Sequence, residues 1–303
     1  MDGQTPTAWI NGSLVPWSEA RISIFDAGVQ HAIGLFETLT AREGRVVDGA
    51  AHVERLITSA RELSLSDRLR ADPLVEAVQL VVDRNDMTEA RIRLTVTGGD
   101  LGPQPPGADR GRVDPTIIIV AQPPTPYPEA FFERGVRVVV ADGRRNPLDP
   151  MGGHKTLNYW PNIHALQVAA TRQAGEALWF TVSNHLCGGS VSNIVLVKGE
   201  KLRTPIARGE EASGALRMPV LPGITRGRIM EHAPARGLAV ETAMLDIEAV
   251  LEADEVFLTN SSWGVLPVVG LEAETIGSGE PGPVTRTLRD DWLRGFDASR
   301  DAD

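Results

Sequence analysis

The spacing of apolar residues along the first third of the chain predicts a mixture of strands and helices. Apolar side chains recur at helical spacing in residues 51–63, whereas the run ARIRLTVT at 90–97 is rich in β-branched residues. Asn-Gly and Glu-Gly pairs interrupt two other apolar stretches, which is typical of hairpin turns. The predicted elements are helices at 51–63 and 74–84, strands at 90–97 and 116–121, and hairpins around Asn11-Gly12 and Glu43-Gly44.

The rest of the chain alternates between strand-like and helix-like stretches, so the predicted fold class is mixed α/β (α+β). Four prolines in the eight residues 122–129, QPPTPYPE, are incompatible with the interior of a helix or a sheet. We therefore predict a small α+β domain at 1–121, a proline-rich linker at 122–129 and a larger domain at 130–303. The expected elements of the larger domain are strands at 136–141, 177–182, 191–197, 238–242 and 255–259 and helices at 158–174, 224–234, 246–251 and 283–295.

Composition and charge narrow the class of protein. The 303 residues are 42% hydrophobic and carry a formal net charge of −10, which disfavours nucleic acid as a partner. No apolar run approaches the roughly 18 residues of a membrane-spanning helix, and residues 1–15 show no secretory signal. Cys187 is the single cysteine, so an intrachain disulfide is excluded. We expect a cytoplasmic enzyme that binds neither nucleic acid nor membranes.

Several familiar site motifs are missing from the sequence. No G-x-G-x-x-G pattern opens a helix after a strand, and no G-x-S-x-G nucleophile elbow occurs. Residues 149–156 resemble a P-loop, but Asp149 and His154 stand where that loop needs glycine. The six histidines have no metal-ligand spacing, so no metal site is predicted.

A lysine and three anion-binding candidates remain. Lys155 follows a glycine pair in GGHKTLNYW and precedes a predicted helix, although a lone lysine in such a turn is more often simply exposed. LPGITR at 221–226 opens a helix whose first amides favour anions. TNSSWG at 259–264 follows a strand, and Arg55 lies on a helix. Each feature alone can be explained without a ligand, as an ordinary helix start, a turn or a solvated charge. Their joint occurrence favours a phosphate-binding site.

The sequence resembles the class IV aminotransferases, the fold-type IV pyridoxal-phosphate enzymes. This family includes branched-chain aminotransferases, D-amino-acid aminotransferases and aminodeoxychorismate lyases. The resemblance covers about residues 8–295 and implies a two-domain fold. The matching segments are FDAGVQHAIGLFET (25–38), HVERLITSA (52–60), KTLNYWPN (155–162), GGSVSNIVLVK (188–198), TP (204–205), LPGITR (221–226) and TNSSWGVLPV (259–268).

The resemblance implies roles for individual residues around pyridoxal 5′-phosphate. Lys155 would carry the cofactor as a Schiff base and move the proton between substrate and cofactor. A phosphate dianion favours a guanidinium and convergent N–H and O–H donors. The implied cofactor ligands are Arg55, Ile224, Thr225 and Ser261 at the phosphate and Tyr159 near the 3′-oxygen. Gly188 and Asn193 are further cofactor-binding positions.

Position 188 departs from the family. Most members have a glutamate five residues before the asparagine matched by Asn193, and that carboxylate pairs with the pyridine nitrogen. Here the position is Gly188, and no Asp or Glu lies between Glu176 and Glu200. Either another group supplies the contact or the ring is a weaker electron sink.

The substrate pocket is less well defined by the resemblance. Gly98 stands where D-amino-acid aminotransferases and many lyases have arginine, which argues against the D-amino-acid type. Arg91 and Arg93 share one face of their strand, and Arg93 matches a carboxylate-site arginine of the branched-chain type, or is a surface arginine. Trp263 either walls the pocket or is a core residue. The predicted substrate-binding residues are Phe36, Arg93, Ser262 and Trp263.

These observations predict a pyridoxal-phosphate-dependent aminotransferase that moves an amino group between a small or aliphatic amino acid and a 2-oxo acid. Branched-chain-like substrates are slightly favoured over D-amino acids. One alternative is an aminodeoxychorismate lyase that releases pyruvate. Another is a cofactor-binding member with degenerate catalysis, because of Gly188. The resemblance also implies a homodimer.

Overall fold

The chain divides into two compact units. The computed structural model describes residues 5–103 and 113–296. The first unit runs from Met1 to Thr125 and includes His154–Tyr159. The second unit comprises Pro126–Gly153 and Trp160–Asp303. Residues 154–159 thus pack with the first unit, although in sequence they lie beyond residue 130.

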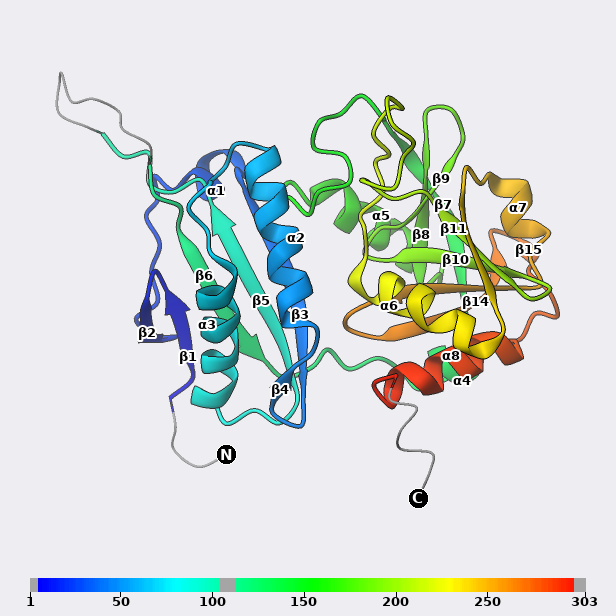
Figure 1. Cartoon of the computed structure of the whole chain (residues 1–303), viewed down its shortest axis with the longest axis horizontal. Coiled ribbons are helices and arrows are strands. Elements are labelled where there is room, and N and C mark those ends of the chain that lie inside the picture. Colours follow the sequence, from blue (N-terminus) through cyan, green and yellow to red (C-terminus); the bar gives the residue numbers. More distant parts are fainter. Residues whose placement is uncertain (1–4, 104–112, 297–303) are drawn as a thin grey trace. The chain divides into compact units, whose positions relative to one another are not determined.

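The first unit is a six-stranded sheet with two long helices (Figure 1). The strand order is β2-β1-β6-β5-β3-β4, and all recorded strand pairs are antiparallel. Its strands are β1 (Thr7–Ile10), β2 (Ser13–Pro16), β3 (Gly34–Arg42), β4 (Arg45–Val46), β5 (Ala90–Thr97) and β6 (Ile117–Gln122), and its helices are α1 (Ala27–His31), α2 (Gly49–Glu62) and α3 (Ala71–Arg84).

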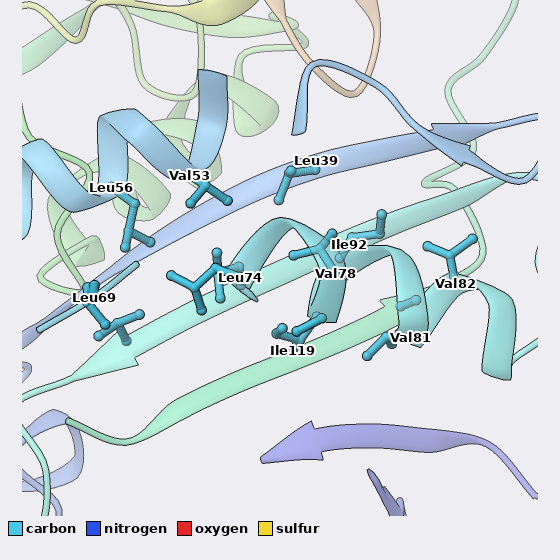
Figure 2. Close-up of a cluster of buried hydrophobic side chains, with 14 of the residues drawn as sticks. Leu39, Val53, Leu56, Leu69, Leu74, Val78, Val81, Val82, Ile92 and Ile119 are labelled. Atoms are coloured by element: carbon cyan, nitrogen blue, oxygen red, sulfur yellow. The ribbon is translucent and has the colours of Figure 1, made fainter. Parts of the chain in front are cut away.

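One face of this sheet is covered by α2 and α3, and the core of the unit lies between these helices and the sheet (Figure 2). Side chains alternate across a strand, so one set from β5, including Ile92 and Leu94, enters the core while Arg91 and Arg93 lie on the opposite face. In β3 the same alternation sends Leu35 and Leu39 into the core. Glu37 shares that core-facing set of positions, so a buried charge is built into the strand.

The second unit is a nine-stranded mixed sheet in the order β12-β11-β10-β13-β14-β7-β8-β9, with β15 beside β14. Three pairs are parallel, namely β11–β12, β14–β7 and β7–β8. Its elements are α4 (Ala130–Glu133), β7 (Val136–Arg145), α5 (Trp160–Thr171), β8 (Glu176–Thr181), β9 (Leu186–Gly189), β10 (Asn193–Lys198), β11 (Lys201–Pro205), α6 (Ile224–His232), η1 (Ala233–Arg236), β12 (Ala239–Ala243), α7 (Ile247–Leu251), β13 (Glu255–Asn260), β14 (Gly264–Leu271), β15 (Glu274–Thr275) and α8 (Pro283–Leu293).

Apolar clusters cover both faces of this sheet. Residues of α5, including Ala165 and Ala169, pack with Trp179 of β8 in one cluster. Residues of α6 and α8, including Ile229 and Leu288, pack with Phe257 of β13 in another. These two clusters lie on one face, and a third cluster, which includes Leu178, Ile194 and Val250 of α7, covers the opposite face. Strands β8 and β10 are therefore continuous buried runs.

The predicted elements are confirmed with shifted ends, and the two predicted hairpins are present. Four strands escaped prediction: β9, β11, β14 and the two-residue β15. β9 is a four-residue segment ending in two glycines, and β14 contains Pro267 inside a central strand, where proline is normally disfavoured. Within the described residues, no helix is long and apolar enough to cross a membrane.

Candidate functional site

Lys155 is fixed to the first unit by backbone pairing with β3. The Phe36 amide donates to the Lys155 carbonyl at 2.9 Å, and the Leu157 amide donates to the Gly34 carbonyl at 2.9 Å. A side chain at Gly34 would collide with Leu157, because a Cβ there would lie 2.6 Å from Leu157 Cδ1. β4 pairs with β3 at residues 41 and 42, which leaves the 34–36 end available for this segment. The lysine backbone is therefore held by a rigid strand.

The small number of lysines in the chain also points to Lys155, and the search for sequence motifs did not use this signal. The sequence contains three lysines, Lys155, Lys198 and Lys201. Lys198 pairs with Asp254 at 3.0 Å and Lys201 pairs with Glu241 at 3.2 Å, and both side chains are at least half exposed. Lys155 alone is partly buried among aromatic rings and arginines, so it is the chain's one candidate for lysine chemistry.

Two aromatic rings and an arginine surround the Lys155 amine. Its Nζ lies 4.5 Å from the centroid of the Phe36 ring and 5.4 Å from that of Tyr159. The two rings meet edge to face at 5.1 Å between centroids. The Arg93 guanidinium carbon lies 3.5 Å from the Phe36 centroid. The structure thus brings together four of the residues predicted from sequence: Lys155, Tyr159, Phe36 and Arg93.

The surroundings of Lys155 lower the pKa of its amine to about 8. Burial is the largest cause, because a charged ammonium loses hydration there, and the charges of Arg55, Arg93 and Arg91 act in the same direction. The charge of Glu37 opposes them by stabilising the ammonium. An amine with a pKa near 8 is partly unprotonated at neutral pH and is therefore a usable nucleophile.

Glu37 is a buried carboxylate that organises the α2 side of this site. It is 1% exposed and accepts from Arg55 Nε at 2.9 Å and Arg55 Nη2 at 2.5 Å. Its other partner is His52 Nδ1, at 2.8 Å. Burial raises the Glu37 pKa, but Arg55 and His52 outweigh it and hold the value at about 2. Arg55, predicted as a phosphate ligand, is thus oriented by a carboxylate that sequence reasoning did not select.

The sequence carried a usable signal for Glu37. It occupies a core-facing position of β3 between Leu35 and Leu39, and a charge at such a position requires a partner. The helix that covers this face provides His52 and Arg55, three residues apart and therefore on one helix face. His154, next to Lys155, also contacts α2 through Ser59 Oγ at 2.9 Å.

In the second unit, the first turn of α6 is organised by a side chain from β10. Asn193 Nδ2 donates to the Leu221 carbonyl at 2.8 Å, and its Oδ1 lies where a Cβ at Gly223 would be. Gly223 caps the helix without a side-chain hydrogen bond, and the first-turn amides of Ile224 and Thr225 have no acceptor within the helix. This end of α6 is suited to an anion.

Arg226 follows these residues but does not add a charge to that helix end. It is 2% exposed and donates to both oxygens of Glu210, at 2.7 and 2.8 Å. Its remaining contacts are Thr204 Oγ1 and the Pro205 carbonyl, each at 3.0 Å. Arg226 therefore stabilises the 204–210 segment.

The turn after β13 is closed by Asn260. Its Oδ1 accepts from the amides of Ser262 and Trp263 at 2.9 and 3.0 Å, which leaves Ser261 at the tip. Trp263 is 7% exposed and belongs to an apolar core cluster, where its ring meets that of Tyr127 edge to face. This burial agrees with the alternative that Trp263 is a core residue.

The backbone at position 188 disfavours any side chain. Gly188 has φ +128°, a region that other residues rarely adopt, and a Cβ there would lie 3.0 Å from the Ser192 carbonyl oxygen. The nearest buried carboxylate in this part of the unit is Glu176, which is 0% exposed. It accepts hydrogen bonds from the turn that follows Gly188, including the Ser190 amide at 3.0 Å.

The predicted site residues therefore form separate groups. Lys155, Tyr159, Phe36, Arg93 and Arg55 belong to the first unit, and the remaining predicted residues belong to the second. Within the second unit, Asn193 contacts the start of α6, and Asn260 links the Ser261 turn to the 189–192 turn through Val191.

Comparisons with known proteins identify the family of this chain. The family model described as amino-transferase class IV matches residues 34–271. A putative branched-chain-amino-acid aminotransferase of Methanocaldococcus jannaschii is 29% identical over 93% of each chain. The aminodeoxychorismate lyase of Bacillus subtilis is 27% identical over 93% of this chain and 92% of its own length.

Solved structures of relatives share the fold. The branched-chain amino acid aminotransferase of Escherichia coli is 26% identical, has a TM-score of 0.85 and matches 96% of this chain over 95% of its own. The branched-chain aminotransferase of the thermophilic archaeon Thermoproteus uzoniensis, solved with norvaline, is 25% identical, with a TM-score of 0.82 over 96% of this chain and 94% of its own. The predicted mixed α/β, fold-type IV architecture is confirmed, and the chain belongs to the class IV aminotransferase family.

Proposed function

We propose that this protein is a pyridoxal-phosphate-dependent aminotransferase with Lys155 as the attachment point of the cofactor. The observation that carries the proposal is the environment of Lys155. It is the one lysine of the chain outside an exposed ion pair, and its pKa is lowered to about 8. Attack on an aldehyde requires an unprotonated amine, which this environment provides near neutral pH.

The described residues fit the chemical groups of pyridoxal phosphate. The first-turn amides of Ile224 and Thr225 are directed out of the helix end, and Ser261 adds a hydroxyl from the turn after β13. We propose that these donors bind the phosphate. The family resemblance implies the same role for Arg55, whose guanidinium is oriented by Glu37. Tyr159, beside Lys155, is assigned to the 3′-oxygen.

When bound, the cofactor supplies an electron sink for the bond broken at the substrate Cα. The chain's own contribution is to hold and move the proton. Lys155 Nζ, freed when the amino donor takes its place, is the group that accepts this proton and returns it. Phe36 limits the space around the amine, and its ring contacts both Lys155 and the Arg93 guanidinium.

We propose a small or aliphatic amino acid and a 2-oxo acid as substrates, with Arg93 binding the carboxylate. Arg93 lies on the Lys155 side of β5, and its planar guanidinium matches a carboxylate. Burial is the largest cause that lowers its pKa, to about 10, so it remains cationic at neutral pH. The named branched-chain aminotransferases among the relatives support this substrate class.

A second candidate is the aminodeoxychorismate lyase reaction, supported by the Bacillus subtilis relative and by Gly188. A carboxylate facing the pyridine nitrogen strengthens the electron sink. The backbone at Gly188 disfavours such a side chain, so reactions that make smaller demands on the ring become competitive. Pyruvate release without an amino acceptor would distinguish the lyase from the aminotransferase.

The test is an absorbance titration of the purified protein with pyridoxal phosphate, followed by L-leucine, D-alanine or L-glutamate. We expect a visible band of the lysine-linked cofactor that bleaches with an L-amino acid. Lys155→Ala should abolish the band, whereas the matched change Lys198→Ala, at an exposed ion pair, should leave it intact. A band that survives Lys155→Ala would contradict the proposal.

A homodimer, implied by the family resemblance, is part of the same proposal. Sedimentation equilibrium should give about twice the 32.6 kDa chain mass at micromolar concentration. A monomer that binds the cofactor normally would contradict the proposed homodimer but not the proposed role of Lys155.

A further inference from the structure

We propose that Glu176 is a positioning residue for both candidate phosphate-binding segments of the second unit. These segments are the start of α6, with the Ile224 and Thr225 amides, and the turn that contains Ser261. This inference rests on the proposed function, because it assumes that these segments bind the cofactor phosphate. It concerns a residue from the start of β8, which belongs to neither segment.

Glu176 anchors the 189–192 turn through a set of hydrogen bonds to one carboxylate. Oε1 accepts from the Ser190 amide at 3.0 Å and from its neighbour, the Ala177 amide, at 2.9 Å. Oε2 accepts from the Val191 amide at 3.2 Å and from Ser192 Oγ at 3.0 Å. Four donors converge on two oxygens, so the turn has one preferred position relative to β8.

The anchored turn reaches the α6 helix end through the next residue. Asn193 follows Ser192 directly and donates to the Leu221 carbonyl at 2.8 Å. Because Leu221 and Gly223 lead into α6, the position of Asn193 decides where the Ile224 and Thr225 amides lie. A shift of the 189–192 turn would therefore move these amides.

The same turn reaches the second segment through Asn260. Asn260 Nδ2 donates to the Val191 carbonyl at 3.2 Å, while its Oδ1 closes the turn that contains Ser261. Thus Val191 is bound on its amide side by Glu176 and on its carbonyl side by Asn260. One carboxylate is coupled to both segments through adjacent residues.

Glycine at position 189 provides the space that this arrangement needs. A Cβ at Gly189 would lie 2.8 Å from both Cγ and Oε2 of Glu176, and it would also collide with Ser192 Oγ. The carboxylate therefore occupies the volume that a side chain at 189 would fill. Trp179 Nε1 and Asn162 Nδ2 bind Ser190 from other directions, at its Oγ and its carbonyl respectively.

The chemistry of Glu176 fits a positioning role rather than a contact with the ring nitrogen. Both oxygens are already used by donors of the turn, and no salt bridge to this carboxylate is found in the described part of the chain. Glu176 therefore does not take the place of the glutamate that most relatives have at the position of Gly188. It lies elsewhere, and its oxygens are already occupied by other donors. Its effect on the cofactor is exerted through Asn193 and Asn260.

The experiment compares the affinities of two ligands, pyridoxal phosphate and pyridoxal, which lacks the phosphate. Glu176→Gln keeps the side-chain shape but puts an amide N–H₂ against backbone donors. We expect the Kd for pyridoxal phosphate to rise by about tenfold or more, while that for pyridoxal stays within about twofold. A purely structural role would weaken both ligands equally.

Glu255→Gln is the matched control. Glu255 also accepts two backbone amides in the second unit, from Val284 at 3.0 Å and Thr285 at 2.7 Å, but it has no recorded bond to either phosphate segment. This variant should lower the melting temperature and leave the ratio of the two affinities unchanged. Ser192→Ala, which removes one bond to Oε2, is the milder second variant if Glu176→Gln does not fold.

The outcomes separate the two hypotheses. A raised ratio of Kd values in Glu176→Gln or Ser192→Ala, absent from Glu255→Gln, supports the positioning role. A folded variant with an unchanged ratio overturns it, and so does an unchanged ratio in Ser192→Ala when Glu176→Gln is unfolded. If the wild-type protein binds no pyridoxal phosphate, the proposed function itself fails, and this inference fails with it.

Discussion

Two fully buried glutamates, one in each unit, are held in opposite ways. Glu37 in the first unit is bound by two cationic or ionisable side chains, Arg55 and His52, which lower its pKa to about 2. Glu176 in the second unit is bound by amides and a hydroxyl of one turn, and burial is the main cause that raises its pKa. Burial acts on both, so the difference comes from the charge of the partners.

The comparison teaches where each carboxylate exerts its effect. Glu37 influences its surroundings through charge, because it pairs with Arg55 and raises the pKa of Lys155. Glu176 acts through geometry, because its partners belong to the polypeptide backbone of a single turn and to Ser192. Charge-removing substitutions should therefore have different consequences in the two units.

The largest expected effect is on the stability of the first unit. Glu37→Gln leaves Arg55 and His52 without their buried counter-charge, and loss of one partner from a buried pair costs about 3–5 kcal/mol. The free energy of unfolding should fall by this amount in urea denaturation at pH 7. A loss below about 1 kcal/mol would mean that the pair behaves like a surface salt bridge.

The pH dependence of stability should have opposite signs for the two residues. Between pH 4.5 and about 2, Glu37 binds a proton in the unfolded chain but not in the folded one, so its contribution of about 3 kcal/mol is lost as pH falls through this window. Glu176, with a raised pKa, binds a proton more readily when folded, so its contribution improves as pH falls towards 4.5. The free energy of unfolding can be measured by urea denaturation across pH for the wild type and for each variant. The difference between wild type and Glu37→Gln should change with pH in the opposite direction to the difference between wild type and Glu176→Gln. Parallel slopes would contradict the contrast.

Placing a glutamate at position 188, where most relatives have one, should destabilise the protein. Gly188→Glu places a side chain at φ +128° and close to the Ser192 carbonyl, and such strain costs about 1–3 kcal/mol. The matched change Gly227→Glu, at a helical position with nothing within 4 Å of its Cβ, should not destabilise the protein, because glutamate has a higher helix propensity than glycine. Thermal unfolding of both variants is the measurement. A stable Gly188→Glu protein would show that the 188–192 backbone is more adaptable than described.

The smallest expected effect is a shift in the pH dependence of cofactor attachment. The charge of Glu37 raises the pKa of Lys155, so Glu37→Gln should lower that pKa and move the onset of rapid attachment to lower pH. Glu176→Gln should leave the onset unchanged, because Glu176 is not among the groups that shift Lys155. Stopped-flow absorbance after mixing with pyridoxal phosphate measures both. An equal shift in the two variants would remove the distinction between charge and geometry.

Sequence patterns predicted the local structure and the lysine because each depends on short segments. Helical spacing in α2 and alternation in β5 follow from burial on one face, and the GGHK segment with its neighbours identified Lys155. The long-range pairing that attaches residues 155–157 to β3 could not be read from local pattern, because partners about 120 residues apart have no fixed spacing.

The two buried glutamates show a further limit of sequence reasoning. Glu37 was detectable as a charge at a core-facing position of a strand. Glu176 was not, because its strand is buried on both faces and shows no alternation that would mark one residue as unusual. The role of Glu176 depends on backbone amides of a turn, and amides have no signature in the sequence.

The central claim is that Lys155 carries the cofactor, and the most direct test is borohydride reduction of the protein incubated with pyridoxal phosphate, followed by peptide mass mapping. The chain's three lysines make the result easy to interpret, with Lys198 and Lys201 as internal controls. We predict stoichiometric phosphopyridoxyl modification at Lys155 and little at the other two. Modification confined to Lys198 or Lys201, or no modification at all, would contradict the account.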